Sequence, residues 1–311
     1  MGVVLPPLAV AIDDTSMVRP SVPEADRLIG ERRPVLSHGF VALVDYMGTD
    51  GAIVQAARVS YGRGTRSVRD DRGLIRYLMR HRHTTPFEMV EYKFLIRLPI
   101  FVARQFIRHR TGSFNETSAR YSIVPDEYEV PPPEEVRHQS TRNRQGRGGP
   151  LPGEVVERFR SDVDRIAKDA YAAYSRALEE GVARETARLL LPVAYYTQWY
   201  WKTNLWNLFH FLSLRLDPHA QEEIRLYAAE IDRIARVVCP VAFEAFEEFQ
   251  LSGVTLGRRE QLAVRALLDG KTPEEACTAA GLTLVREDGR PVASGEGPEF
   301  LDKLARIRSL A

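Results

Sequence analysis

The residues best suited to chemistry lie between Gln105 and Ser122, in the stretch QFIRHRTGSFNETSARYS. On a helix, Gln105 and Arg108 lie one turn apart and share a face. Arginine provides planar, paired donors that fit phosphate oxygens, and the serines and threonines that follow add short hydroxyl donors. Glu116, the only acid of the stretch, could accept a hydrogen bond from a ribose hydroxyl or a base N–H. These residues predict a socket for a nucleotide or another phosphate-bearing molecule, and their composition fits an ordinary solvated basic turn equally well.

The run from Arg108 to Ser118, RHRTGSFNETS, resembles a known signature. It matches every fixed position of the RHRxxSxNExS motif of flavin-dependent thymidylate synthases, seven positions within eleven residues. Further segments resemble that family's other landmarks in the same order: AARVSYG at 56–62, HTTPFE at 83–88, PIFVARQ at 99–105, ARLLLP at 187–192 and HAQ at 219–221. The resemblance extends from about Leu36 to Leu251.

The resemblance implies both a fold and a reaction. The fold is α+β, with a small antiparallel sheet, packed helices and a long helical portion. The reaction is the reductive methylation of dUMP to dTMP, with methylenetetrahydrofolate as carbon donor and FAD, reduced by NADPH, as the source of hydride. The assembly is a homotetramer whose active sites are shared between subunits. The family needs no cysteine nucleophile, and Cys239 and Cys277 lie away from the signature, as small packing residues would.

Carried over position by position, the resemblance assigns a mostly basic set of residues to dUMP: Gln105, Arg108, Glu116, Ser118, Arg120, Arg188 and Arg215. A dianionic phosphate and a uracil ring that must become electron-rich both favour arginines. The resemblance makes Arg215 catalytic, because it polarises the uracil and stabilises the N3-deprotonated form. The pattern alone favours a different role, a cation that opposes the dipole at a helix C-terminus. Ser118 has no histidine–acid pair at a suitable spacing and is assigned to binding.

The same carry-over assigns eight residues to FAD: Thr85, Arg108, His109, Arg110, Glu116, Asn204, Trp206 and His210. The pyrophosphate of FAD suits paired arginines, and the edge of its isoalloxazine suits amide and imidazole partners. Because the sequence has no Rossmann glycine fingerprint, FAD must bind to another architecture. One position departs from the family, which commonly has Asn-x-Arg-Ser where this chain has Asn204-Leu205-Trp206-Asn207.

The departure at Trp206 leaves alternatives open. The ring could stack on the flavin, or it could pack in the core or at a subunit interface. It also raises the possibility of a flavin-binding homologue that has lost synthase activity, against which the intact Arg188 and Arg215 argue.

Regular elements must position the signature. Residues 39–46 are apolar and rich in strand formers, and the alternation over 90–98 predicts a half-buried strand. Pro99, a residue tolerated in the first turn, predicts a helix over 99–109. The apolar residues within 74–81 have the spacing of a helix, which predicts a short helix there.

Helices are also expected after the signature. Helical periodicity predicts a helix that begins at Glu154. Four further helices are predicted at 183–191, 195–214, 219–238 and 241–251. The stretch from Tyr195 to Leu214 holds all three tryptophans, a density that suggests burial between subunits.

The chain divides into three parts on this reading. Residues 1–35 form an irregular N-terminal arm, and 36–251 form the catalytic domain, with an arginine-rich insertion at 131–153 that predicts a solvated loop or disorder. Residues 252–311 form a small helical extension. Its helix, glycine turn and Thr-capped helix weakly resemble a helix-turn-helix, but the second helix carries no basic residue to face phosphate. An appendage that packs on its own protein is the favoured interpretation.

Composition narrows the class further. A chain with 44% hydrophobic and 27% charged residues is typical of a soluble globular protein. With 43 basic and 42 acidic residues the net charge is +1, so nucleic-acid binding is the weaker alternative, motivated by the arginines at 137–147 and by the tail. The His81-x-His83 pair lacks a third ligand, so no metal site is predicted. Neither a signal peptide nor a membrane span is recognised, and a cytoplasmic enzyme is expected.

Overall fold

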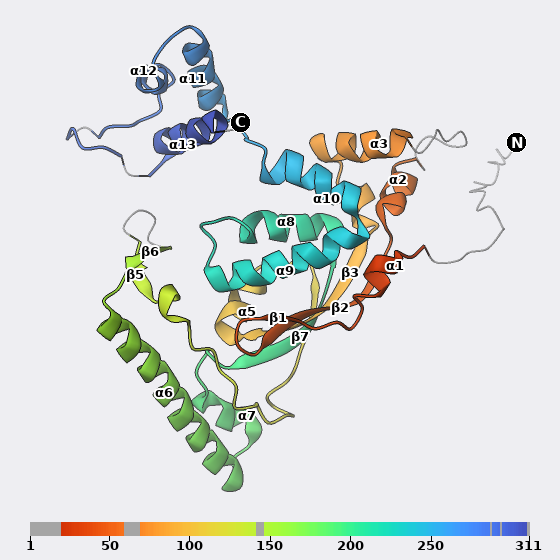
Figure 1. The fold of residues 1–311 in the computed structure, drawn as a ribbon, viewed down its shortest axis with the longest axis vertical. Helices are drawn as coiled ribbons and strands as arrows, with labels where there is room; N and C mark the ends of the chain where they lie inside the picture. Colours follow the sequence, from red (N-terminus) through yellow and green to blue (C-terminus); the bar gives the residue numbers. More distant parts are fainter. Residues whose placement is uncertain (1–19, 59–68, 141–145, 287, 293, 310–311) are drawn as a thin grey trace, which may run out of the picture.

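An antiparallel sheet forms the centre of the molecule in the computed structural model, which describes residues 20–58, 69–140, 146–286, 288–292 and 294–309 (Figure 1). Its strand order is β1-β2-β3-β7-β4, and every neighbouring pair is antiparallel. The strands are β1 (Arg33–Val35), β2 (Gly39–Met47), β3 (Glu91–Pro99), β4 (Ser113–Glu116) and β7 (Tyr196–Asn204). The predicted α+β fold with a small antiparallel sheet is confirmed.

Strand β3 has the predicted alternation. Tyr92, Phe94, Ile96 and Leu98 are fully buried, whereas residues between them are partly or fully exposed. Such a period of two places one set of side chains on the core face of the sheet. The Tyr92 hydroxyl donates to the Ala235 carbonyl at 3.1 Å and so joins the sheet to a helix above it.

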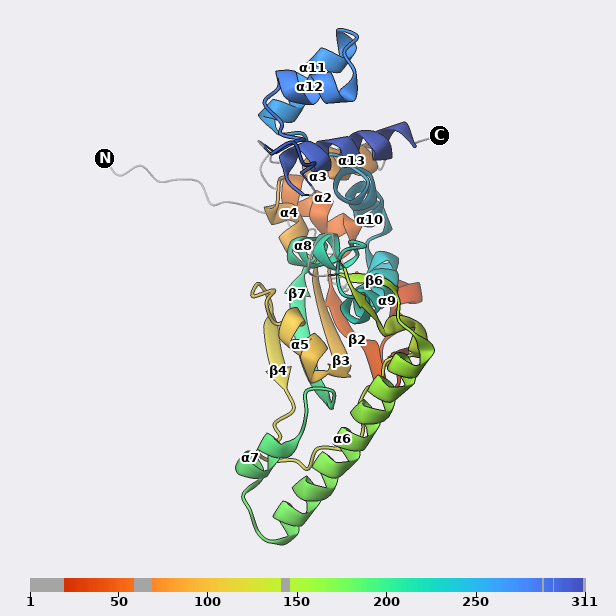
Figure 2. The ribbon, with the colours of Figure 1, turned by 90° about the vertical axis from the view of Figure 1, so that its left-hand side faces the viewer.

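Helices pack on the sheet and at one end of it (Figures 1 and 2). They are α1 (Pro23–Asp26), α2 (Asp50–Arg58), α3 (Arg69–Arg80), α4 (Thr85–Glu88), α5 (Ile100–Phe106), α8 (Leu205–Arg215), α9 (Glu222–Val238) and α10 (Pro240–Phe246), which a π-helical turn, η4 (Glu247–Leu251), extends. Helix α10 begins after the predicted break at Cys239-Pro240, and the Asp50 carboxylate caps it by accepting from the amides of Val241 and Ala242, each at 2.9 Å.

The helix predicted over 195–214 was wrong for its first half. Residues 196–204 form β7, which pairs with β3 along its whole length, and only residues from Leu205 onward are helical. Aromatic residues suit a strand between two neighbours, where their rings pack on the pleated surface. Trp199 and Trp201 are 2% and 1% exposed within a single chain, so the expected burial of these two between subunits was also wrong. Their rings fill the core of their own chain.

The arginine-rich insertion is more ordered than predicted. After a 3-10 turn, η2 (Pro133–Glu135), strands β5 (Arg137–Gln139) and β6 (Arg147–Pro150) form an antiparallel ribbon, while residues 141–145 lie outside the described part. Arg147 forms ion pairs with Glu135 and with the largely buried Glu223, the latter at 2.5 Å. Glu223, which is distant in the sequence, therefore helps to fix this segment, and no local pattern could indicate that contact.

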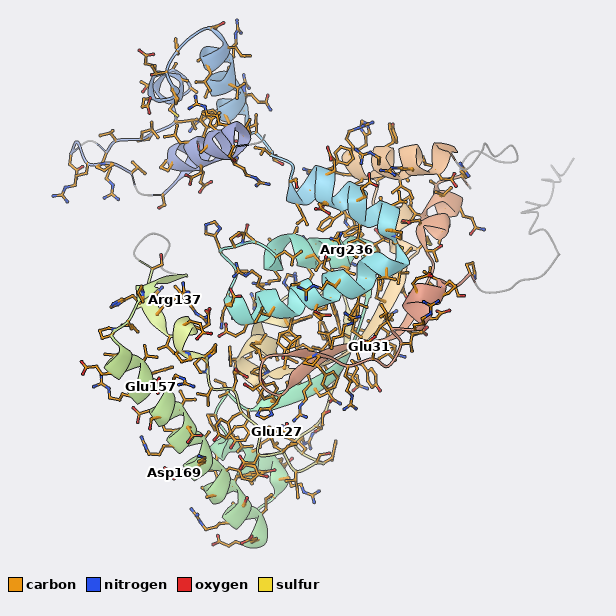
Figure 3. All side chains as sticks on the ribbon, in the orientation of Figure 1. Glu31, Glu127, Arg137, Glu157, Asp169 and Arg236 are labelled. Carbon is orange, nitrogen blue, oxygen red and sulfur yellow. The ribbon has the colours of Figure 1, made fainter. Side chains whose placement is uncertain are left out.

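A long helix, α6 (Gly153–Glu179), follows the ribbon and runs along the lower edge of the molecule to α7 (Arg184–Ala187) and a 3-10 turn, η3 (Arg188–Leu190) (Figure 2). Charged side chains such as Glu157 and Asp169 line α6 (Figure 3), and both pair with arginines one turn away. Exposed pairs of this kind contribute little to stability. Among the described residues, no helix is long and apolar enough to cross a membrane.

The first part of the chain differs in one respect from the predictions, and some of the predicted segments lie outside the described residues. Residues 20–35 are less irregular than expected, because α1 and the edge strand β1 lie within them. Residues 1–19, and residues 59–62 of the AARVSYG segment, lie outside the described residues.

The C-terminal tail forms a small helical unit, drawn in dark blue in Figure 1, with α11 (Arg258–Leu268), α12 (Pro273–Ala279) and an unpredicted third helix, α13 (Glu296–Arg308). Thr272 caps α12 as expected: its hydroxyl accepts from the Glu275 amide at 3.3 Å, and the Glu275 carboxylate accepts from the Thr272 amide at 2.9 Å. The tail has its own apolar cluster around the fully buried Phe300.

Phe300→Ala is expected to unfold the tail alone. Removing a buried phenylalanine costs about 3–5 kcal/mol, which a core this small cannot supply. Hydrogen exchange is the measurement: amides of 256–309 should lose protection while those of β3 keep it. Phe209→Ala, in the main core, is the matched control and should weaken β3. Loss of protection in β3 after Phe300→Ala would show instead that the two cores unfold together.

Candidate active site

Helix α5 delivers the signature residues to the site. It begins after Pro99, which is extended, and buries Val102, Ala103 and Phe106. The Phe106 ring contacts Trp201 at 4.9 Å and Phe211 at 4.5 Å between centroids. The end of α5 is thus anchored in an aromatic cluster, and residues 108–110 follow directly from that anchor.

The glycine of the signature, Gly112, allows the chain to pass close to Trp201. A Cβ atom at this position would lie 2.5 Å from the indole Nε1, closer than packed atoms tolerate. The chain then enters β4, where Phe114 pairs with Trp201 of β7. Gly112 therefore sets the distance between the end of α5 and the sheet.

Gly112→Ala is expected to lower the free energy of unfolding by about 1–3 kcal/mol, because the added methyl group overpacks the buried indole. Gly73→Ala is the matched control: Gly73 lies in α3 with no atom within 4 Å of the added Cβ. There the change should be neutral or stabilising by about 0.5–1 kcal/mol. Denaturant titration measures both, and equal effects would show that the indole is not the cause.

Arg215 and His109 form the first group of predicted site residues. Arg215 lies on the last turn of α8, and its Nε donates to His109 Nε2 at 2.9 Å. Burial lowers the pKa of His109 to about 4, and the electrostatic effects of Arg215 and then His210 lower it further. The imidazole is therefore neutral near pH 7 and accepts the hydrogen bond. Burial also lowers the pKa of Arg215, which remains charged.

Gln105 lies close to this group. Its side-chain amide donates to the side chain of Gln221, the residue before the first turn of α9. The predicted dUMP ligand on α5 is thus held by the HAQ segment, which adjoins the end of α8 in sequence.

The predicted flavin ligands gather around α4, α8 and the end of α5. Asn204 caps α8 by accepting from the Asn207 amide at 2.9 Å, which leaves its NH₂ group available. Trp206 packs against Phe87 of α4, with ring centroids 5.9 Å apart, and joins the main core. His210 is exposed one turn further along α8, and its ring lies 6.1 Å from that of His109.

Two exposed arginines complete that set. Within the part of the chain that the structure describes, the guanidinium groups of Arg108 and Arg110 pair with no carboxylate. Thr85 is the exposed first residue of α4. Glu116 is the one predicted flavin ligand that lies elsewhere, on β4.

A second group lines a pocket of about 580 Å³ beside β4 and the start of β7. Three predicted dUMP ligands line it: Glu116, Ser118 and Arg188. The Glu116 carboxylate accepts from Thr197 Oγ1 at 2.5 Å. Glu185 holds both arginines of this group, because its carboxylate accepts from Arg120 Nε at 3.1 Å and its carbonyl accepts from Arg188 Nε at 3.2 Å.

Within one chain, the residues predicted to bind dUMP thus form two separate groups. Gln105, Arg108 and Arg215 lie around α5 and α8, whereas Glu116, Ser118, Arg120 and Arg188 lie around the pocket. Among the described residues, no hydrogen bond joins the two groups, and of their members only Glu116, Ser118 and Arg188 line the pocket. Figure 2 shows α8 at one end of β7 and α7 toward the other.

Other residues singled out from the sequence have structural roles. Cys239 and Cys277 are free and buried in the main core and the tail core, which confirms them as packing residues. The His81 ring packs on Tyr77 at 4.3 Å. Within the described residues, no group of three or more His, Cys, Asp or Glu side chains could hold a metal ion.

Comparison with known proteins decides the family. A family model described as thymidylate synthase complementing protein matches residues 42–241. A flavin-dependent thymidylate synthase of Thermus thermophilus is 54% identical over 249 residues, which cover 80% of this chain and 90% of the relative. This chain belongs to the flavin-dependent thymidylate synthase family. A second member, from Rickettsia bellii, is 48% identical over 263 residues, which cover 80% of this chain and 90% of that relative.

Solved structures agree with the family. The UMP/dUMP methylase PolB from Streptomyces cacaoi, bound with 5-Br dUMP, is 38% identical to this chain with a TM-score of 0.64. The match covers 70% of this chain and 99% of that one.

Three residues of this chain form hydrogen bonds with the predicted site residues, but the sequence analysis assigned them no role. Gln221 was visible as part of the HAQ landmark, and Glu185 lies three residues before Arg188, the spacing of one helical turn. Thr197 gave no signal, because its segment was interpreted as a helix, on which it would not face β4.

Proposed function

We propose that this chain converts dUMP to dTMP by reductive methylation, with methylenetetrahydrofolate as carbon donor and FAD, reduced by NADPH, as hydride source. We further propose that it acts in the cytoplasm as a homotetramer. The observation that carries the proposal is Arg215, a charged arginine that donates a hydrogen bond to a neutral histidine of the family signature, His109.

The pocket residues suit the nucleotide end of dUMP. Arg188 and Ser118 line the pocket with a guanidinium group and a hydroxyl, which fit a phosphate dianion, and Arg120, which follows the lining residue Ala119 and pairs with Glu185, adds a positive charge nearby. Glu116 accepts hydrogen bonds and suits a ribose hydroxyl or the N–H of the base. The structural relative bound with 5-Br dUMP supports a 5′-phosphorylated uridine nucleotide as the substrate class.

Arg215 suits the base. Its half-buried positive charge stabilises negative charge on the uracil, including the N3-deprotonated form, and so makes the ring carbon that receives the methyl group more nucleophilic. Water competes less with such a charge where the site is partly desolvated. Gln105, fixed by Gln221, adds a polar contact on the same side.

The residues around α8 fit a flavin. Arg108 and Arg110, which pair with no carboxylate among the described residues, suit the pyrophosphate, while the amide of Asn204 and the ring of His210 suit the isoalloxazine edge. The reduced flavin supplies the hydride when it is bound. Trp206 packs on Phe87 and the core, and this supports a structural role for the residue that replaces the family's arginine.

The division of the dUMP ligands supports shared active sites. Since a single chain brings only part of the set to each group, a complete site requires the pocket group of one subunit to face the Arg215 group of another. Closed symmetric assemblies repeat such a contact at every subunit.

The visible absorption spectrum of the purified protein tests the proposal first, before and after addition of FAD and then dUMP. A flavin spectrum that changes with dUMP is expected, since both ligands share one site, followed by dTMP formation when folate and NADPH are supplied. Absence of bound flavin would contradict the catalytic proposal, with Trp206→Arg as the variant to restore it. Bound flavin without dTMP formation would identify a homologue that has lost the reaction.

A further inference from the structure

Arg215 is held by an imidazole and not by a carboxylate. Arg147, Arg120 and Arg236 are each held by carboxylates. Among the described residues, Arg215 forms no ion pair, and its side chain makes one hydrogen bond, from Nε to His109 Nε2. Asp217, the nearest acid in sequence, accepts instead from His219, with 2.8 Å between Oδ1 and Nδ1.

We propose that His109 is a positioning residue, which fixes the direction of the Arg215 guanidinium through a neutral hydrogen bond and leaves its positive charge available to the substrate. The proposal rests on the proposed function, because it assigns a role to His109 in the same reaction. It differs from the flavin contact implied by the resemblance, because Nε2 already serves Arg215.

The contact with His109 uses only Nε of the Arg215 guanidinium. Nε is the donor to His109, so both terminal nitrogens remain to address a planar ligand with two parallel hydrogen bonds. A carboxylate in place of the imidazole would hold the arginine equally well, but its negative charge would oppose the polarisation of the uracil.

The imidazole is itself firmly placed. Its ring meets the edge of Phe211 with centroids 4.9 Å apart, and Phe211 packs on Phe106. His109 thus fixes the position of Arg215 relative to the aromatic core. Burial keeps the His109 pKa low, and the electrostatic effects of the two neighbours that face it, Arg215 and His210, act in the same direction. An imidazolium would lose its acceptor and repel Arg215.

Three substitutions separate positioning from flavin binding. His109→Ala should lower kcat by about 10²-fold, the typical effect of a 1 Å misplacement, with a smaller change in KM for dUMP and with flavin content unchanged. His109→Gln keeps a neutral acceptor at similar reach and should stay within a few-fold of wild type. His109→Glu should bind flavin and hold Arg215, yet lose kcat through the added charge.

Two kinetic outcomes would overturn the proposal. One is a His109→Ala variant with wild-type kcat at saturating FAD. The other is equal loss of activity in His109→Ala and His109→Gln together with loss of flavin, which would leave His109 a flavin ligand only.

Histidine-selective labelling and NMR test the contact without any turnover. In the wild type, His109 should titrate with a pKa of about 4, and in Arg215→Ala its pKa should rise because a neighbouring positive charge is gone. Titration of His109 near 6.5 in both proteins would overturn the proposal. This result does not depend on dTMP formation, so failure of the proposed function and failure of the positioning role are separately visible.

Discussion

Replacement of Arg215 by alanine is expected to lower kcat for dTMP formation by about 10²–10³-fold, the usual effect of losing one donor that stabilises developing charge. The loss should fall on kcat more than on KM, because the interaction strengthens as the uracil becomes electron-rich. Flavin should remain bound, since α8 keeps its cap at Asn204 and its buried face. Steady-state kinetics with the flavin content measured by absorption is the test.

Arg233→Ala is the matched control for that variant. Arg233 also lies on a helix, but it is exposed and pairs with Glu230 away from the site, so activity should be unchanged. Unchanged turnover in Arg215→Ala would return Arg215 to the simpler role of a cation at a helix C-terminus. That role contributes only about 0.3–1 kcal/mol to stability and should weaken with salt.

Replacement of Arg188 by alanine is expected to lower kcat/KM for dUMP by about 10–100-fold, because a charge-assisted hydrogen bond contributes about 1.5–3 kcal/mol. Here the loss should fall on KM, since phosphate binding is the same in the ground state and the transition state. Arg184→Ala on the neighbouring α7 is the control: its guanidinium donates to the Tyr121 carbonyl at 2.9 Å and does not line the pocket.

Mixed oligomers of the Arg188→Ala and Arg215→Ala variants should regain activity. If each site takes Arg188 from one subunit and Arg215 from another, random assembly of Arg188→Ala with Arg215→Ala chains leaves about a quarter of the sites intact. Co-purification through a tag on one chain verifies the mixed oligomers, and dTMP formation measures the recovery. Mixed oligomers that stay inactive would show that both residues act within one subunit.

Local periodicity explains which elements were predictable. The alternation in β3, the proline before α5 and the apolar face of α9 each express a period that a short window reveals. Strand β7 lacks such a signal, because aromatic residues occupy both of its faces and its pairing with β3 is decided by residues a hundred positions away. The ribbon β5–β6 is held in part by Glu223, which lies 76 residues beyond Arg147.

The site shows the same limit at the level of side chains. The signature from Arg108 to Ser118 could be recognised because its residue types are set by the ligand and lie close together. The partners that orient those residues come from elsewhere in the fold: Gln221 at the N-cap of α9, Glu185 from α7 and Thr197 from β7. Their roles follow from the packing of the elements, which a single sequence does not display.

The division of the dUMP ligands within one chain has a thermodynamic consequence. A ligand that bridges two subunits binds the assembled state only, so substrate binding and subunit association must reinforce each other by the same free energy. At low protein concentration, dilution should therefore weaken the apparent affinity for dUMP, and dUMP should draw dissociated subunits together. In the proposed assembly the substrate would form part of the subunit interface, and the enzyme concentration would help to set the apparent affinity for dUMP.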